Sequence, residues 1–149
     1  MADLINNIKN LREISGAGFL DCKRALEENN NEIEKSVDYL RKKGLSIANK
    51  KSNREAKEGA IGIFSKDKLT VILQINTETD FAAKNDTFLS FVENIATIAL
   101  DSKNVDLSID DLNKIDVDGR SVSELFTDII AKIGENIILN KLSLIDHSE

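Results

Sequence analysis

The spacing of apolar residues changes along this chain, and that change constrains the fold more than any other feature. Residues 3–43 carry apolar side chains at helical spacing, as in Leu4, Ile8 and Leu11. Residues 60–64 and 69–75 are instead short runs rich in β-branched side chains, separated by the four polar residues 65–68. Helices followed by a predicted hairpin indicate an α+β protein.

Three short helices are predicted in the first part. The first has Asp3 as its N-cap and ends at the two glycines of residues 15–18. The second ends in the asparagines 29–31, and the third begins with Asn31 as its cap and ends at Gly44. Helices this short are unstable alone, so we expect them to pack into a bundle.

A basic segment follows the bundle. Residues 41–57 contain seven basic side chains and one acidic side chain, whereas the whole chain has a net charge of −6. We expect a linker between two domains at this place.

The second part returns to helical spacing after the hairpin. Residues 76–85 interrupt two regular elements, and residues 87–100 are predicted to be an amphipathic helix. Residues 101–118 contain six aspartates and two lysines, which indicates a solvated acidic loop and not a carboxylate site.

A capping box opens the next predicted helix. Ser121 and Glu124 have the required spacing, and the helix runs through Leu125, Ile129 and Ile133 to a stop at Gly134. Residues 137–145 alternate weakly and are predicted to form a last strand. If that strand is unpaired, it favours association with a second copy of the chain.

The sequence offers little for chemistry of its own. The single cysteine, Cys22, lies on an apolar helix face, and the single histidine, His147, is almost at the end of the chain. Residues 16–18 begin like a phosphate-binding loop but follow a helix and lack the third glycine. We therefore expect no enzyme, no cofactor and no metal site.

Nothing in the sequence indicates a membrane or a secretory route. The first residues lack the charged and apolar regions of a secretion signal, and no apolar run approaches the roughly 18 residues that span a bilayer. We expect a cytoplasmic protein, most simply bacterial, although a mature organelle protein would look the same.

Three segments together resemble elongation factor Ts. Residues 11–26, LREISGAGFLDCKRAL, are similar to its signature L-R-x-x-T-G-A-G-[MF]-x-D-C-K-x-A-L. Residues 79–85, TDFAAKN, are similar to its second signature T-D-F-V-A-K-N, and residues 132–136, KIGEN, match a third. The three matches occur in the family's order across nearly the whole chain.

The resemblance implies a fold and a division of the chain. It implies a ubiquitin-associated-like three-helix bundle at residues 1–44, a basic linker at 45–58, and a core of antiparallel strands packed with helices at 59–149. Longer members of the family continue into a second core half and further modules, so we expect a short or C-terminally truncated form.

The resemblance also implies an activity. Elongation factor Ts is a guanine-nucleotide exchange factor for elongation factor Tu, in which a loop enters the GTPase and displaces its Mg²⁺ site. By matching position, that loop is Thr79, Asp80, Phe81 and Ala82, with Ala82 in place of the family's valine. The bundle contact would be made by Arg12, Phe19, Leu20 and Lys23.

Each of these assignments has a simpler alternative. Phe81 could be a core residue between a strand and a helix, and Phe19 and Leu20 could belong to the bundle core. Arg12 and Lys23 could lie on a solvated helix face. An alternative function is a helical adaptor or RNA-associated module that uses the basic linker, although that linker has no aromatic residue to stack on bases and we expect no direct nucleic-acid binding.

Overall fold

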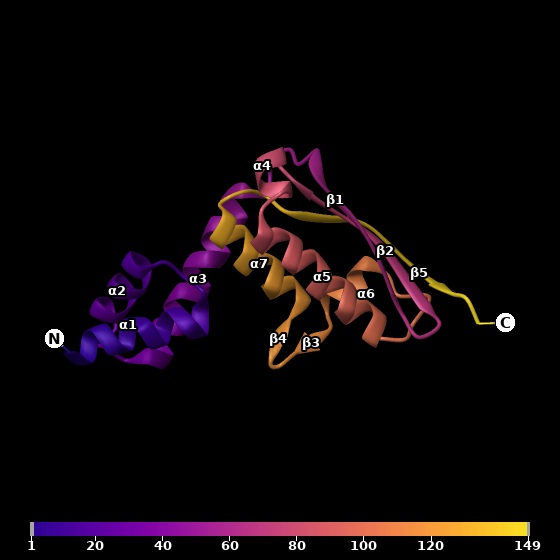
Figure 1. Cartoon of the computed structure of the whole chain (residues 1–149). Coiled ribbons are helices and arrows are strands. Elements are labelled where there is room, and N and C mark those ends of the chain that lie inside the picture. The colour runs from indigo at the N-terminus through magenta and orange to yellow at the C-terminus, as the bar shows by residue number, and fades with distance from the viewer. Residues whose placement is uncertain (1, 149) are drawn as a thin grey trace. The chain divides into compact units, whose positions relative to one another are not determined.

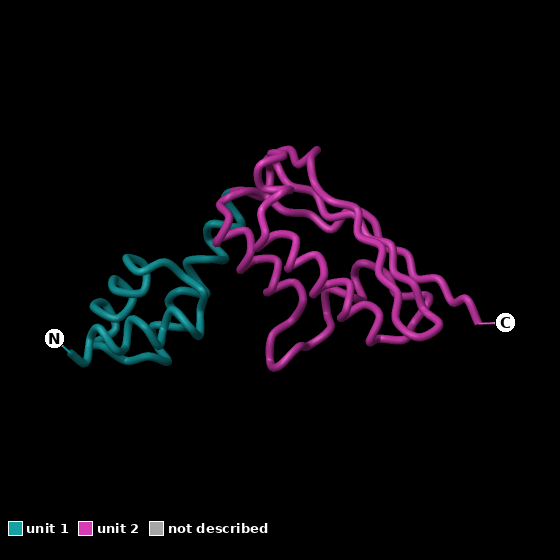
Figure 2. Tube along the Cα trace, viewed as in Figure 1, with its two compact units in different colours: residues 1–50 teal, residues 51–149 magenta. Residues whose placement is uncertain are grey.

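The computed structural model describes residues 2–148. The chain divides into two compact units, residues 1–50 and 51–149 (Figure 2). The regular elements described in the first unit are all helices, and every strand described in the chain lies in the second unit. The predicted α+β class, with a small antiparallel sheet, is therefore confirmed.

The first unit is a bundle of α1 (Ala2–Ser15), α2 (Phe19–Glu28) and α3 (Ile33–Lys51) (Figure 1). Its core joins one face of α1 to one face of α2, and partly buried side chains of α3 pack against it. The fully buried members are Ile8, Leu11, Cys22, Ala25 and Leu26. The predicted bundle follows from this shared core, which none of the three helices could build alone.

The predicted limits of these helices need three corrections. Asp3 lies inside the first turn of α1 and is not its cap. Asn31 lies in a turn with φ 64°, and α3 begins two residues later at Ile33. The helix end predicted at Gly44 is wrong, because Gly44 is buried inside α3 and the helix continues to Lys51. The helix therefore tolerates the cost of about 1 kcal/mol that a helical glycine carries relative to alanine. Residues 45–51 of the predicted linker are thus helical.

The second unit contains a three-stranded antiparallel sheet. The strands are β1 (Glu58–Lys66), β2 (Leu69–Thr77) and β5 (Ile138–Asp146), with β2 in the centre. Lys66 pairs with Leu69, so the predicted hairpin has a two-residue turn. The last strand is not unpaired, because β5 forms a ladder with β2.

One face of the sheet is covered by helices (Figure 1). Helix α5 (Asp86–Asp101) packs on β1 and β2, and α7 (Val122–Ile133) packs against α5. The rings of Phe91 and Phe126 meet edge to face, with centroids 4.9 Å apart, and join these two helices. The short helix α4 (Asp80–Ala83) lies at the end of β2.

The acidic stretch is more ordered than predicted. It contains α6 (Ile109–Asn113), which begins with a capping box between Ser108 and Asp111 and buries Leu112. Two short strands, β3 (Asp116–Val117) and β4 (Arg120–Ser121), follow it. The prediction of a loop throughout residues 101–118 was therefore wrong.

Helix α7 has the predicted ends but a different buried face. Both hydrogen bonds of its capping box are present, and Gly134 ends it in the left-handed conformation with φ 82°. The predicted face of Leu125, Ile129 and Ile133 is displaced, because Leu125 and Ile133 are only partly buried. The side chains that pack into the core are Val122, Phe126, Ile129 and Ile130.

Candidate functional site

The segment between β2 and α5 forms a tight, capped turn. Thr79 has extended backbone, and its hydroxyl oxygen accepts a hydrogen bond from the Ala82 N–H at 3.3 Å, which caps α4. The Thr77 hydroxyl donates to the Thr79 carbonyl at 2.8 Å. A second cap follows at once, because the Asn85 side chain accepts from the Thr87 N–H at 2.8 Å and so opens α5.

Phe81 projects from this turn into solvent. Its side chain is 84% exposed, more than any other large apolar residue described in the chain. The next residue, Ala82, is buried at 6%, and Asp80 is exposed in an ion pair with Lys84 at 3.7 Å. The alternative of a core residue at position 81 is therefore wrong. One side of the turn is anchored in the protein and the other presents an aromatic ring.

The turn is held from a distant part of the chain by Glu135, the residue after the glycine that ends α7. One carboxylate oxygen, Oε1, accepts hydrogen bonds from the backbone N–H groups of Glu78 at 3.0 Å and Thr79 at 2.9 Å. The other oxygen accepts from the Thr79 hydroxyl at 2.7 Å. Charge-assisted bonds of this kind are stronger than neutral ones.

The connection is reciprocal. The Glu78 carboxylate accepts from the backbone N–H of Asn136 at 2.8 Å, so each glutamate binds the backbone beside the other. Glu78 also lies 3.6 Å from the guanidinium of Arg54, and Asn136, which is 4% exposed, donates to the Arg54 carbonyl at 2.7 Å. We call these two glutamates and Asn136 the crossed clamp. It joins the start of the sheet unit, the end of β2 and the start of β5.

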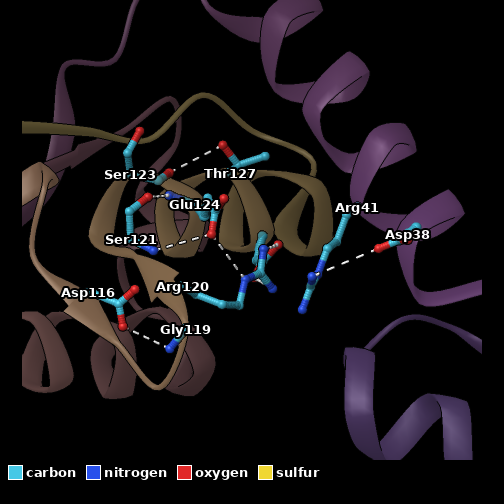
Figure 3. Close-up of polar contacts among 10 residues, drawn as sticks. Asp38, Arg41, Asp116, Gly119, Arg120, Ser121, Ser123, Glu124 and Thr127 are labelled. Atoms are coloured by element: carbon cyan, nitrogen blue, oxygen red, sulfur yellow. Dashed lines mark hydrogen bonds and ion pairs between the residues drawn. The ribbon is translucent and has the colours of Figure 1, made fainter. Parts of the chain in front are cut away.

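Helix α7, which leads into the crossed clamp, is also fixed at its other end (Figure 3). Ser121 and Glu124 exchange their capping-box hydrogen bonds at 3.2 Å each. Arg120 holds Asp128 on the next turn of the helix with both terminal guanidinium nitrogens, at 2.5 and 3.0 Å. Glu135 is therefore attached to a helix that is constrained at its beginning as well as at its end.

In the helical unit, the residues predicted for partner contact lie on the surface. Phe19 is 48% exposed and Leu20 is 74% exposed at the start of α2, so the alternative of two bundle-core residues is wrong. Arg12 is exposed on α1, and Lys23 forms an ion pair with Glu27 at 3.7 Å. Two adjacent apolar side chains in water form a small candidate contact surface.

Comparison with known proteins covers both units. Residues 78–149 match the family model described as Elongation factor TS. An elongation factor Ts from Bartonella bacilliformis is 46% identical over 136 residues, which are 90% of this chain and 43% of that protein. The elongation factor Ts of Rhizobium meliloti is 44% identical over 141 residues, 93% of this chain and 45% of that protein. The chain belongs to the elongation factor Ts family. It spans less than half the length of these curated relatives.

The single cysteine, Cys22, is buried in the core of the bundle. Burial raises the pKa of the Cys22 thiol, so the group is protonated at neutral pH and packs as a small core residue. Residues 2–148 contain no group of three or more metal-ligating side chains. No helix among the described residues is long and apolar enough to cross a membrane.

The basic segment is partly neutralised by carboxylates. Arg41 pairs with Asp38 at 4.0 Å (Figure 3), Lys43 with Asp21 at 2.7 Å, and Lys57 with Glu55 at 3.0 Å. With the contact between Arg54 and Glu78, four of the seven basic side chains have acidic partners. Much of the charge of this segment is thus neutralised within the chain.

The crossed clamp was missed by sequence reasoning. The segment KIGEN served only as a family match, and Glu78 received no role. No periodicity or spacing links these residues, because Glu78 and Glu135 are 57 positions apart.

Proposed function

We propose that this chain is a guanine-nucleotide exchange factor for elongation factor Tu and acts in translation elongation in the cytoplasm. Membership in the elongation factor Ts family supports the role. The observation that carries it is Phe81, a ring that is 84% exposed on a turn otherwise anchored in the protein. A ring this exposed buries little apolar area in the folded chain, and it lies in the TDFAAKN segment that resembles the family's contact loop, so a binding role accounts for it.

The proposed mechanism is differential binding without bond-making. An exchange factor binds the nucleotide-free GTPase more tightly than the GDP-bound form, and by linkage GDP weakens the factor to the same degree. GDP is held in such GTPases largely through its phosphates and Mg²⁺. A group that enters near the Mg²⁺ site and disturbs it therefore lowers the affinity for GDP.

In this proposal Phe81 is the inserted group, and Thr79, Asp80 and Ala82 form the turn that presents it. Burying one phenylalanine ring in the partner contributes about 1.5–3 kcal/mol, which corresponds to roughly one to two powers of ten in the competing equilibrium. The remaining affinity comes from a wider surface, to which Arg12, Phe19, Leu20 and Lys23 contribute.

The test is the release of a fluorescent GDP analogue from bacterial elongation factor Tu, with and without this chain. We expect the chain to accelerate release, and Phe81→Ala to reduce the acceleration by roughly ten- to a hundredfold. Val105→Ala, which removes another exposed apolar side chain of the same unit, is the matched control and should leave the rate unchanged.

Three outcomes would contradict parts of the proposal. Equal loss in both variants would mean that Phe81 has no special role. Binding to elongation factor Tu without acceleration would make the chain a docking fragment. No binding at all would remove the proposed function.

The alternative of an RNA-associated module predicts a different salt dependence. Binding through phosphate contacts weakens steeply as salt rises, whereas insertion of an apolar ring changes little. Affinity for elongation factor Tu and affinity for a single-stranded RNA, each measured at roughly 50 and 200 mM salt, separate the two.

A further inference from the structure

The two backbone donors that Glu135 satisfies lie just beyond the sheet ladder. Thr77 is the last residue of β2 and pairs with Glu58, so the N–H groups of Glu78 and Thr79 follow the end of the β1–β2 pairing. Both donate to the same carboxylate oxygen, at 3.0 and 2.9 Å. The Glu135 side chain thus supplies the acceptor for the two backbone N–H groups that follow the end of the strand pairing.

Thr79 connects Glu135 to α4 through hydrogen bonds of its hydroxyl group. Its hydroxyl donates to Glu135 at 2.7 Å and accepts from the Ala82 N–H at 3.3 Å, so one hydroxyl joins the clamp to the first turn of the helix. A hydroxyl has one proton, and donating it to Glu135 leaves the oxygen lone pairs for the cap. Phe81 is the second residue of the helix that this cap orients.

An exposed ring binds more tightly when its position is already fixed before the partner arrives. In water, an apolar side chain on a loose turn gains by folding back onto its own protein, and ordering it again on binding reduces the affinity. Residues that hold a contact group in its bound geometry improve binding mainly by removing that cost.

We propose that Glu135 is a positioning residue for Phe81, and that Glu78 and Asn136 lock it in place through the crossed clamp. This inference rests on the proposed function, because it concerns how the ring reaches elongation factor Tu. Glu135 itself makes no contact with the partner in this proposal. It acts through the three hydrogen bonds that fix the Thr79 cap.

The main test is a double-mutant cycle on GDP release from elongation factor Tu. Glu135→Ala should reduce the acceleration by roughly five- to tenfold when Phe81 is present. In the Phe81→Ala background the same change should have almost no further effect, because there is no ring left to position. Asp111→Ala is the matched control and should leave the rate unchanged, since it removes a hydrogen-bonded carboxylate from the capping box of α6, outside the clamp.

The cycle separates positioning from simple loss of structure. An equal loss of rate in both backgrounds would overturn the inference, because a purely structural role does not depend on the ring. No loss with Glu135→Ala would overturn it as well. If Phe81→Ala itself had no effect, the proposed function would fail, and the clamp would have to be judged by the next measurement.

Amide hydrogen exchange of the full chain without partner tests the clamp directly. Glu135→Ala should speed exchange at Glu78 and Thr79 at least tenfold and leave Leu73 in the centre of β2 unchanged. Unchanged exchange at Glu78 and Thr79 would overturn the inference.

If Leu73 also lost protection, Glu135→Gln would decide. That variant keeps one carbonyl oxygen for the two backbone donors but removes the charge and the second acceptor. It should retain the sheet and lose part of the acceleration, and a fully active Glu135→Gln with an unprotected turn would overturn the inference.

Discussion

The helical unit and the sheet unit present their candidate contact residues in different ways. Phe19 and Leu20 lie at the start of α2, and the helix that carries them is held by a core of neighbours within about 20 positions in the sequence. Phe81 lies on a four-residue helix that is held by hydrogen bonds from residues 56–58 positions away. A surface residue on a bundle therefore needs only local packing, whereas a projecting ring on a short turn needs distant support.

The largest expected effects come from core truncation in each unit. Leu26 in the bundle and Leu73 in β2 are 0% and 1% exposed, so replacing either with alanine should cost about 2–5 kcal/mol. Leu26→Ala should expose the Cys22 thiol to a thiol reagent and leave hydrogen exchange in β2 unchanged. Leu73→Ala should do the opposite. If each substitution affected both probes, the two units would unfold as one.

A smaller effect is expected at a glycine of the sheet edge. A Cβ on Gly59 would lie 2.2 Å from the Ile75 carbonyl oxygen and 2.7 Å from the Asn76 Cα, and its φ is 148°. Gly59→Ala should lower the free energy of unfolding by about 1–3 kcal/mol, because the backbone must move.

Gly119→Ala is the matched control for this substitution. Gly119 also has a positive φ, 86°, but nothing lies within 4 Å of its added Cβ. Its cost should be limited to the conformational strain of about 1–2 kcal/mol. Thermal unfolding of both variants checks the difference, and an equal loss would show that strain alone, without a clash, explains Gly59.

The smallest expected effect is a pH dependence confined to the bundle. Burial raises the pKa of Cys22 in the folded protein, so the folded state favours the protonated thiol. This contribution is complete below the ordinary thiol pKa and is lost as pH rises through the raised value. Denaturant unfolding of the wild type and of Cys22→Ala at rising alkaline pH should show a steeper loss in the wild type. Parallel curves would contradict the prediction.

Local signals in the sequence predicted most of the regular structure. The capping box of Ser121 and Glu124, the stop at Gly134 and the β1–β2 hairpin were all correct, because each depends on residues close together in the chain. Gly44 misled, since it lies inside the long helix α3 in spite of its weak helix propensity. Helix α6 was missed because its capping box lies inside a strongly acidic stretch.

The candidate site was predictable only in part. The TDFAAKN motif located the turn, and Phe81 in it is exposed, while its contact role stays a prediction. The support of that turn was beyond sequence reasoning, because side chain to backbone hydrogen bonds between distant loops leave no periodic pattern. Glu135 could be identified only once the fold had brought α7 and β2 together.

The separation of the two glutamates also determines when the turn is completed as the protein is made. A ribosome synthesises the chain from its N-terminus, so Phe81 emerges long before Glu135, and 57 residues separate Glu78 from its partner. A nascent chain that ends before residue 136 already contains the ring but lacks the crossed clamp. The turn is therefore completed only after residue 136 has left the ribosome.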